Sequence, residues 1–230
     1  MKLPAQPNQS LMEGLEVLLA LARRGEATGV RELAREMGMT PTRLQRYVGT
    51  LAYLGLAAQD EQRKYRPGPG IHALSAITLS ASGLARNAME MLPPLSDWGV
   101  TVALGVLWRK TVSYLYFRAP GSTPAQALGK TQDWPALDSV IGHVLLAEKP
   151  AFWIQDHFPE AATALADQLA HVRNCGYARI ARSDMEISLG VPVGHPAIAG
   201  LAITGHPERI FEDEFVATLK QCAASLAAST

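Results

Sequence analysis

Three consecutive residues in the second half of the chain, Gly129, Lys130 and Thr131, have the types and order of a phosphate-binding loop. A Walker A loop has the pattern G-x-x-x-x-G-K-[ST], in which backbone N–H groups surround the phosphates and the lysine reaches them. Here Pro124 replaces the first glycine and has no N–H to donate, and Pro135 interrupts any helix that would follow. We therefore expect no nucleotide hydrolysis and no bound cofactor.

Asp138, Ser139 and His143 have the residue types of a serine-based catalytic site. No G-x-S-x-G turn surrounds the serine, however, and residues four apart are ordinary neighbours on a helix. Asp138 or Ser139 is instead predicted to cap the helix that follows. The histidines show no His-x-x-x-His pair, and Cys175 and Cys222 form no Cys-x-x-Cys pair, so no metal site is expected. We expect no catalytic residues and a protein that is not an enzyme.

The segment from residue 38 to residue 59 contains arginines, threonines and glutamines but no acidic residue. Arginine and glutamine can make bidentate contacts with guanine and adenine edges, and threonine suits phosphate oxygens or a thymine methyl group. At 100° per residue, Leu44 and Leu51 lie on the inner side of a helix, whereas Arg46 and Gly49 face outward. This pattern is typical of a DNA-reading helix. The predicted DNA-contacting residues are Thr40, Thr42, Arg43, Gln45, Arg46, Thr50, Arg63 and Lys64.

Three helices are predicted to position these residues, at 10–24, 30–37 and 41–54. Apolar residues recur in them at helical spacing, and a glycine follows each one. Thr40 and Pro41 are typical of the N-cap and first residue of the third helix. In the first helix, the predicted apolar stripe is Leu11, Leu15, Leu18 and Ala22.

Residues 56–66 are predicted to form a hairpin with a polar tip, which the PGPG sequence at 67–70 ends. Three helices with a short turn before the third, followed by a hairpin, have the order of a winged helix-turn-helix. The alternative is a small three-helix bundle that binds nothing.

The second half of the chain is predicted to be an antiparallel sheet with helices, which makes the fold class α+β. Hairpins are expected at 100–108 with 111–119 and at 186–193 with 197–205, the first joined by the two residues Arg109 and Lys110. Helices are expected at about 139–147, 163–174 and 208–228, the last with an apolar stripe that starts at Phe211. Between the halves, residues 69–85 carry no charged side chain and a stripe of small and apolar residues, which is typical of packing against a second copy.

The segment from Val30 to Gly70 resembles the winged helix-turn-helix of the IclR-type bacterial transcriptional regulators. Three later segments are also similar to that family: PALDSVIGHVLLA at 135–147, CGYA at 175–178 and VPV at 191–193. The resemblance implies a winged helix-turn-helix domain at 1–68, a linker and dimerisation helix at 69–85 and a GAF-like effector domain at 86–230. It also implies a homodimer or a tetramer. The stretch at 178–185 is shorter here than in the family, and Pro67 replaces a leucine usual after the wing.

The best place for a small-molecule effector is the N-terminus of the helix predicted at 139–147, whose free N–H groups and dipole attract an anion. The family's pocket opens there, and the resemblance carries over Asp138, Ser139, Ser188, Ala202 and Thr204 as effector-binding residues. Because Asp138 would repel a carboxylate, an aromatic or neutral effector is as plausible as a small organic acid. Alternatively, side chains fill the pocket and no effector binds.

Composition supports a folded, cytoplasmic protein. Of the 230 residues, 48% are hydrophobic, enough for a sizeable core, and neither a signal peptide nor a lipid-spanning segment is expected. The net charge is zero, but residues 1–80 hold 10 Lys and Arg against 7 Asp and Glu, so the first part is mildly basic. We expect a regulator that binds a double-stranded DNA operator under control of a small molecule. The rival functions are an enzyme built on the second domain and a winged-helix module that contacts protein.

Overall fold

The structure is a computed structural model that describes residues 6–127, 134–182 and 186–228. The chain divides into two compact units, residues 1–78 and 79–230, each with its own core. Within the described residues, no helix is both long enough and apolar enough to cross a membrane.

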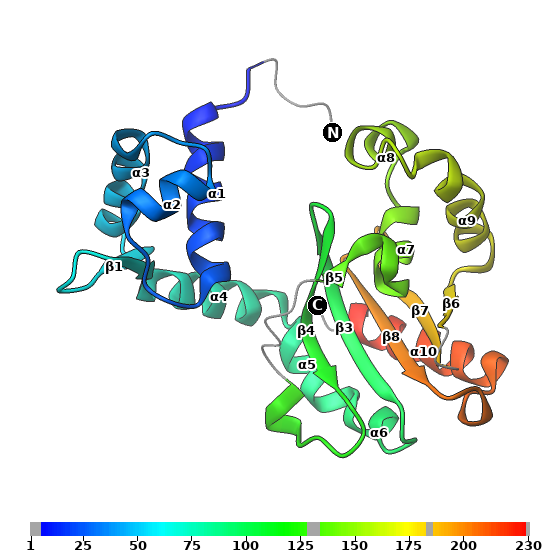
Figure 1. The fold of residues 1–230 in the computed structure, drawn as a ribbon. Helices are drawn as coiled ribbons and strands as arrows, with labels where there is room; N and C mark the ends of the chain where they lie inside the picture. The colour runs from blue at the N-terminus through cyan, green and yellow to red at the C-terminus, as the bar shows by residue number, and fades with distance from the viewer. Residues whose placement is uncertain (1–5, 128–133, 183–185, 229–230) are drawn as a thin grey trace. The chain divides into compact units, whose positions relative to one another are not determined.

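The N-terminal unit is a winged helix-turn-helix (Figure 1). Its elements are α1 (Gln9–Arg24), α2 (Val30–Glu36), α3 (Pro41–Tyr53), β1 (Ala57–Gln59), β2 (Tyr65–Pro67) and the start of α4 (Pro69–Ser82). Thr40 is the N-cap of α3, as predicted, and its Oγ1 accepts from the backbone N of Arg43 at 3.3 Å. Strands β1 and β2 pair antiparallel to form the wing.

The buried face of α1 is not the stripe that the sequence predicts. Glu13, Val17 and Leu21 are buried, whereas Leu11 and Leu15 are 62% and 51% exposed. Two apolar stripes run along this helix, and the one with Val17 and Leu21 packs in the core with α2 and α3, while the Glu13 carboxylate beside it has partners on α3. The predicted inner side of α3 is confirmed, since Leu44 and Leu51 are buried together with Val48, and α2 buries Leu33 and Ala34.

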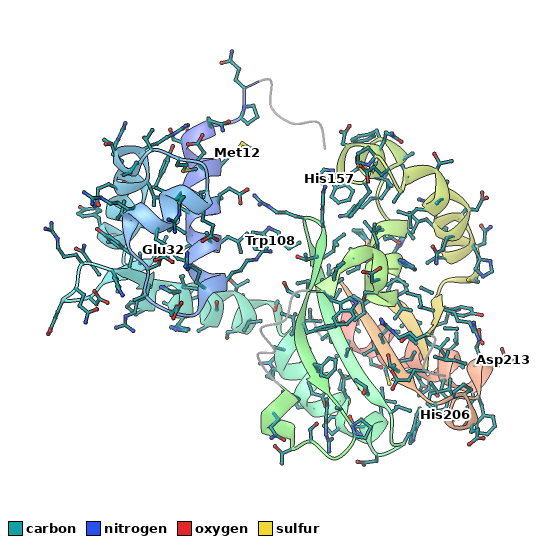
Figure 2. The ribbon with its side chains drawn as sticks, viewed as in Figure 1. Met12, Glu32, Trp108, His157, His206 and Asp213 are labelled. Carbon is teal, nitrogen blue, oxygen red and sulfur yellow. The ribbon has the colours of Figure 1, made fainter. Side chains whose placement is uncertain are left out.

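The C-terminal unit is built on a six-stranded antiparallel sheet in the order β5-β4-β3-β8-β7-β6, so the predicted α+β class is confirmed. The strands are β3 (Thr101–Trp108), β4 (Thr111–Arg118), β5 (Trp134–Pro135), β6 (Ala178–Ala181), β7 (Ile187–Val193) and β8 (Ala199–Gly205). Arg109 and Lys110 form the predicted two-residue turn between β3 and β4, with Trp108 at the hairpin tip (Figure 2). Strands β5 and β6 were not expected from the sequence.

Helices cover both faces of this sheet (Figure 1). Helices α5 (Leu84–Met91), α6 (Pro93–Ser96) and α10 (Glu212–Ala228) pack on one face, and α7 (Val140–Ala147), α8 (Ala151–His157) and α9 (Ala162–Cys175) belong to the core on the other. The predicted last helix begins too early: Phe211 precedes α10 and is exposed, because a short 3-10 turn at Pro207–Arg209 comes first. The predicted linker is interrupted at Gly83, whose φ of 64° separates α4 from α5.

Helix α7 lies close against β7 and β8 because glycines face it. A Cβ added to Gly200 would come within 2.9 Å of Ile141, and one added to Gly190 within 3.0 Å of Val140. At Gly142, within α7, an added Cβ would overlap the carbonyl oxygen of Ala136. These three positions fix where α7 begins relative to the sheet.

Candidate nucleic-acid interface and ligand site

The predicted DNA-contacting residues of α3 share an exposed surface. Thr42, Arg46 and Thr50 are exposed on the first three turns, and Thr40 lies beside them as the N-cap. Arg63 and Lys64 are exposed in the turn of the wing, where the backbone N of Lys64 donates to Asp60 Oδ1 at 2.8 Å. The predicted contacts on this surface are positive or neutral, as a phosphate-facing surface requires.

A hollow of about 450 Å³ opens on the outward side of α3, lined by Gln45, Arg46, Gly49, Thr50 and Tyr53. A Cβ added to Gly49 would meet no atom within 4 Å, so the gap above this residue is open. Tyr53, which the sequence analysis missed, is 91% exposed. Its position seven residues after Arg46, on the same side of the helix, is the signal that would have found it.

Two residues of the predicted set already have partners within the unit. Gln45 Nε2 donates to the hydroxyl of Tyr65 on β2 at 3.0 Å, which connects α3 to the wing. Arg43 Nη2 lies 2.5 Å from Glu13 Oε1, and the hydroxyl of Tyr47 donates to the other carboxylate oxygen. The hydrogen bonds from Tyr47 and Gln9 hold the pKa of Glu13 below its ordinary value, so this buried side chain is a carboxylate at neutral pH.

In the C-terminal unit, three of the predicted effector-binding residues lie on one face of the sheet. Ser188 pairs with Thr204 across β7 and β8, and Ala202 pairs with Gly190, which contacts α7. Because side chains alternate along a strand, Ser188, Ala202 and Thr204 face the same side as α7. The hydroxyl oxygens of Ser188 and Thr204 are 2.8 Å apart.

Ser139 and Asp138 stand at the start of α7 in different roles. Ser139 is the N-cap and its Oγ accepts from the backbone N of Gly142 at 3.4 Å. The Asp138 side chain is exposed. The backbone carbonyl oxygen of Asp138 accepts hydrogen bonds from Arg182 Nη2 at 3.0 Å and from Trp134 Nε1 at 3.2 Å. The guanidinium of Arg182 also lies 5.4 Å from the centre of the Trp134 ring.

Tyr114 and Arg182 join this group although the sequence analysis did not select them. Burial raises the pKa of Tyr114, while a hydrogen bond with Ser139 and the charge of Arg182 act to lower it. The Tyr114 hydroxyl and the Ser139 side chain form a hydrogen bond, and the positive charge of Arg182 acts on the same phenol. The start of α7 therefore brings a phenol, a serine hydroxyl and a guanidinium together.

The catalytic alternative finds no support in the geometry of His143. Its Nε2 lies 2.7 Å from the carbonyl oxygen of Leu137, and its Nδ1 lies 3.2 Å from Gln168 Nε2. Burial lowers the pKa of this imidazole, and both nitrogens face partners other than Ser139. Gly129, Lys130 and Thr131 lie outside the described residues. Among the residues that are described, no three His, Cys, Asp or Glu side chains are grouped to hold a metal ion.

Comparisons with known proteins agree with this architecture. Residues 10–61 match the IclR helix-turn-helix domain. A structure assigned to the IclR regulators from Silicibacter sp. TM1040 is 20% identical with a TM-score of 0.80, covering 95% of each chain. An IclR family transcriptional regulator from Brucella abortus is 21% identical with a TM-score of 0.73, covering 100% of this chain and 94% of that one.

An IclR homolog from Microbacterium hydrocarbonoxydans, complexed with 4-hydroxybenzoate, is 18% identical with a TM-score of 0.66, covering 96% of this chain and 98% of that one. At such identities the likeness establishes the shared fold. No curated protein matches the sequence.

Because the space above Gly49 is open, replacing this glycine by alanine is expected to stabilise the fold and to weaken DNA binding. Gly49→Ala should raise the free energy of unfolding by about 0.5–1 kcal/mol, since glycine is a poor helix former. The added methyl group should weaken DNA binding by roughly 1 kcal/mol, about fivefold, if DNA approaches this backbone. Denaturant unfolding and a fluorescence titration with duplex DNA measure the two effects.

Gly14→Ala is the matched control, because an added Cβ there makes only an ordinary contact with Tyr47, 3.9 Å away. It should stabilise α1 without changing DNA affinity. Unchanged affinity in Gly49→Ala would show that the hollow is not in contact with DNA.

Proposed function

Since residues 10–61 match the IclR helix-turn-helix domain and solved IclR-type structures share the fold of the chain, we propose that it is a transcriptional regulator of that type, which binds a double-stranded operator with an affinity set by a small molecule in the C-terminal unit. The observation that carries the proposal is the outward surface of α3, which is exposed and free of acidic residues. A solvated helix surface without a function usually mixes charges of both signs. A surface of one sign suits the phosphate backbone.

Arg46 is the residue proposed to read a base edge. It is exposed in the middle of α3, and its side chain has no carboxylate partner within the described part of the chain. A guanidinium in the major groove can bind guanine O6 and N7 together. The remaining proposed contacts to bases and phosphates are Thr40, Thr42, Gln45, Thr50, Arg63 and Lys64.

Arg46→Ala should weaken operator binding by about 1–3 kcal/mol and relax the preference at one base step. Binding of the variant to a set of duplexes with single base changes measures both quantities. Arg86→Ala, which removes an arginine from α5, outside the helix-turn-helix, is the control and should bind as the wild type does. An equal loss on every duplex would make Arg46 a phosphate contact, and unchanged affinity would remove it from the interface.

We also propose that the protein acts as a homodimer assembled through α4. This helix has no buried side chain, and Leu74 and Ile77 on one side of it are 56% and 67% exposed. An apolar helix without a partner is unfavourable in water, and a second copy covers it symmetrically. In a dimer, two α3 helices about 34 Å apart would meet successive major grooves.

Ile77→Glu in the full chain should raise the dimer dissociation constant at least about tenfold, since a charge would enter the apolar interface. Sedimentation equilibrium measures this constant. His72→Glu introduces the same side chain on the opposite side of α4 and should change it little. Equal dissociation constants for the two variants would reject α4 as the dimer element.

The proposed effector is a small organic acid bound at the start of α7. Within the described residues no carboxylate pairs with Arg182, and the Asp138 side chain is exposed to solvent, so the local charge favours an anion. Tyr114 and Phe117 stack edge-on with ring centres 5.3 Å apart and offer an apolar wall. The ligand of the Microbacterium relative, 4-hydroxybenzoate, is an acid with an aromatic ring.

If the acid regulates DNA binding, its dissociation constant should change about 5–150-fold when the protein is saturated with operator, because coupling between two sites is reciprocal. Calorimetry with 4-hydroxybenzoate and related acids, with and without operator, measures this change. Arg182→Gln should weaken binding of the acid, whereas Arg179→Gln should not, because Arg179 pairs with Glu212 of α10 on the other face of the sheet. Equal constants with and without operator would mean that the acid binds without regulating.

A further inference from the structure

Glu13 is a carboxylate held almost entirely inside the helix-turn-helix unit. Its side chain is 11% exposed and lies on the same side of α1 as the core residues Val17 and Leu21. It accepts hydrogen bonds from Gln9 Nε2 at 2.9 Å, from Arg43 Nη2 at 2.5 Å and from the Tyr47 hydroxyl. A carboxylate so placed is costly unless it is paired, and Arg43 supplies its one positive partner among the described residues.

Two of the three donors come from α3, the helix proposed to read DNA. Arg43 and Tyr47 are four residues apart, so they lie one above the other on the same side of that helix. One carboxylate on α1 therefore holds two successive turns of α3. Such a contact fixes the rotation of α3 about its axis. It therefore also fixes the direction of the side of α3 on which Arg46 and Gly49 face outward.

DNA would compete with Glu13 for Arg43. If Arg43 turned to a phosphate, Glu13 would keep only two neutral donors, and its negative charge would lie close to the negative backbone of DNA. Arg46 faces no such conflict, because it has no carboxylate partner in the part of the chain that the structure describes. Contact with DNA would therefore break the ion pair of Arg43 with Glu13, whereas Arg46 would lose no such pair.

We propose that Glu13 is a positioning residue that keeps Arg43 off the DNA and holds α3 in its reading orientation. The inference rests on the proposed function, since it takes α3 as the DNA-reading helix. It removes Arg43 from the predicted contacts and gives it a role within the protein instead.

The number of phosphates that a protein neutralises can be counted, because log Kd rises with log salt concentration with a slope of about 0.9 per phosphate on duplex DNA. A purely structural role for the Glu13–Arg43 pair would leave this slope unmoved in both Arg43→Gln and Glu13→Gln. The slope therefore separates a positioning role from a stabilising one.

The experiment uses the full chain as wild type, Arg43→Gln, Lys64→Gln and Glu13→Gln, with a duplex that the wild type selects from a random-sequence pool and a scrambled duplex of equal length. Kd is measured on both duplexes at several salt concentrations. Arg43→Gln should keep the wild-type slope, whereas Lys64→Gln, which changes an exposed wing cation, should lose about 0.9. Glu13→Gln releases Arg43, so its slope should rise by about 0.9 and its preference for the selected duplex should fall.

A slope that drops by about 0.9 in Arg43→Gln would show that Arg43 neutralises a phosphate and would overturn the inference. The inference also fails if Glu13→Gln keeps both the wild-type slope and the wild-type preference. Circular dichroism checks that both variants fold, since Arg43→Gln leaves Glu13 without a positive partner. Should Glu13→Gln fail to fold, Arg43→Gln still tests whether Arg43 stays off the DNA, because a drop of about 0.9 in its slope would overturn the inference. A wild type that selects no duplex would overturn the proposed function itself, and this inference with it.

Discussion

Close packing of α7 on the sheet is the constraint on which the arrangement of the C-terminal unit depends. Gly190 and Gly200 leave no side chain between the strands and Val140 or Ile141. Because the helix cannot move away without opening a void, its first residue is fixed beside the hydroxyl groups of β7 and β8. A rigid support of this kind is what a ligand site needs, since loosely held groups bind weakly.

Local signals predicted the helix-turn-helix unit well. Thr40 and Pro41 determine where α3 begins through a cap and a fixed φ, and Gly25, Gly38 and Gly55 adopt the positive φ that ends a helix or forms a turn. The buried side of α1 was predicted wrongly because hydrophobicity alone favours its leucines. The buried stripe is the one that packs against α2 and α3, and the partners of Glu13 beside it lie thirty or more residues further along the chain.

The ligand site shows the same division between local and distant information. Ser139 was found as a cap because its role depends on the next three residues. Arg182 was missed because its position depends on β6, a four-residue strand, and on the pairing of that strand with β7. Strand pairing across a sheet follows from tertiary packing, which no short window of sequence contains.

Gly83 divides the predicted linker helix into two separate helices. A continuous helix behaves as a rod that passes torque along its hydrogen-bonded turns, but α4 ends at Ser82 and the first bond of α5 runs from Asn87 to the Gly83 carbonyl. No backbone ladder spans the left-handed residue between them. The hydrogen bonds of α4 therefore do not continue into α5, and the two helices are separate segments.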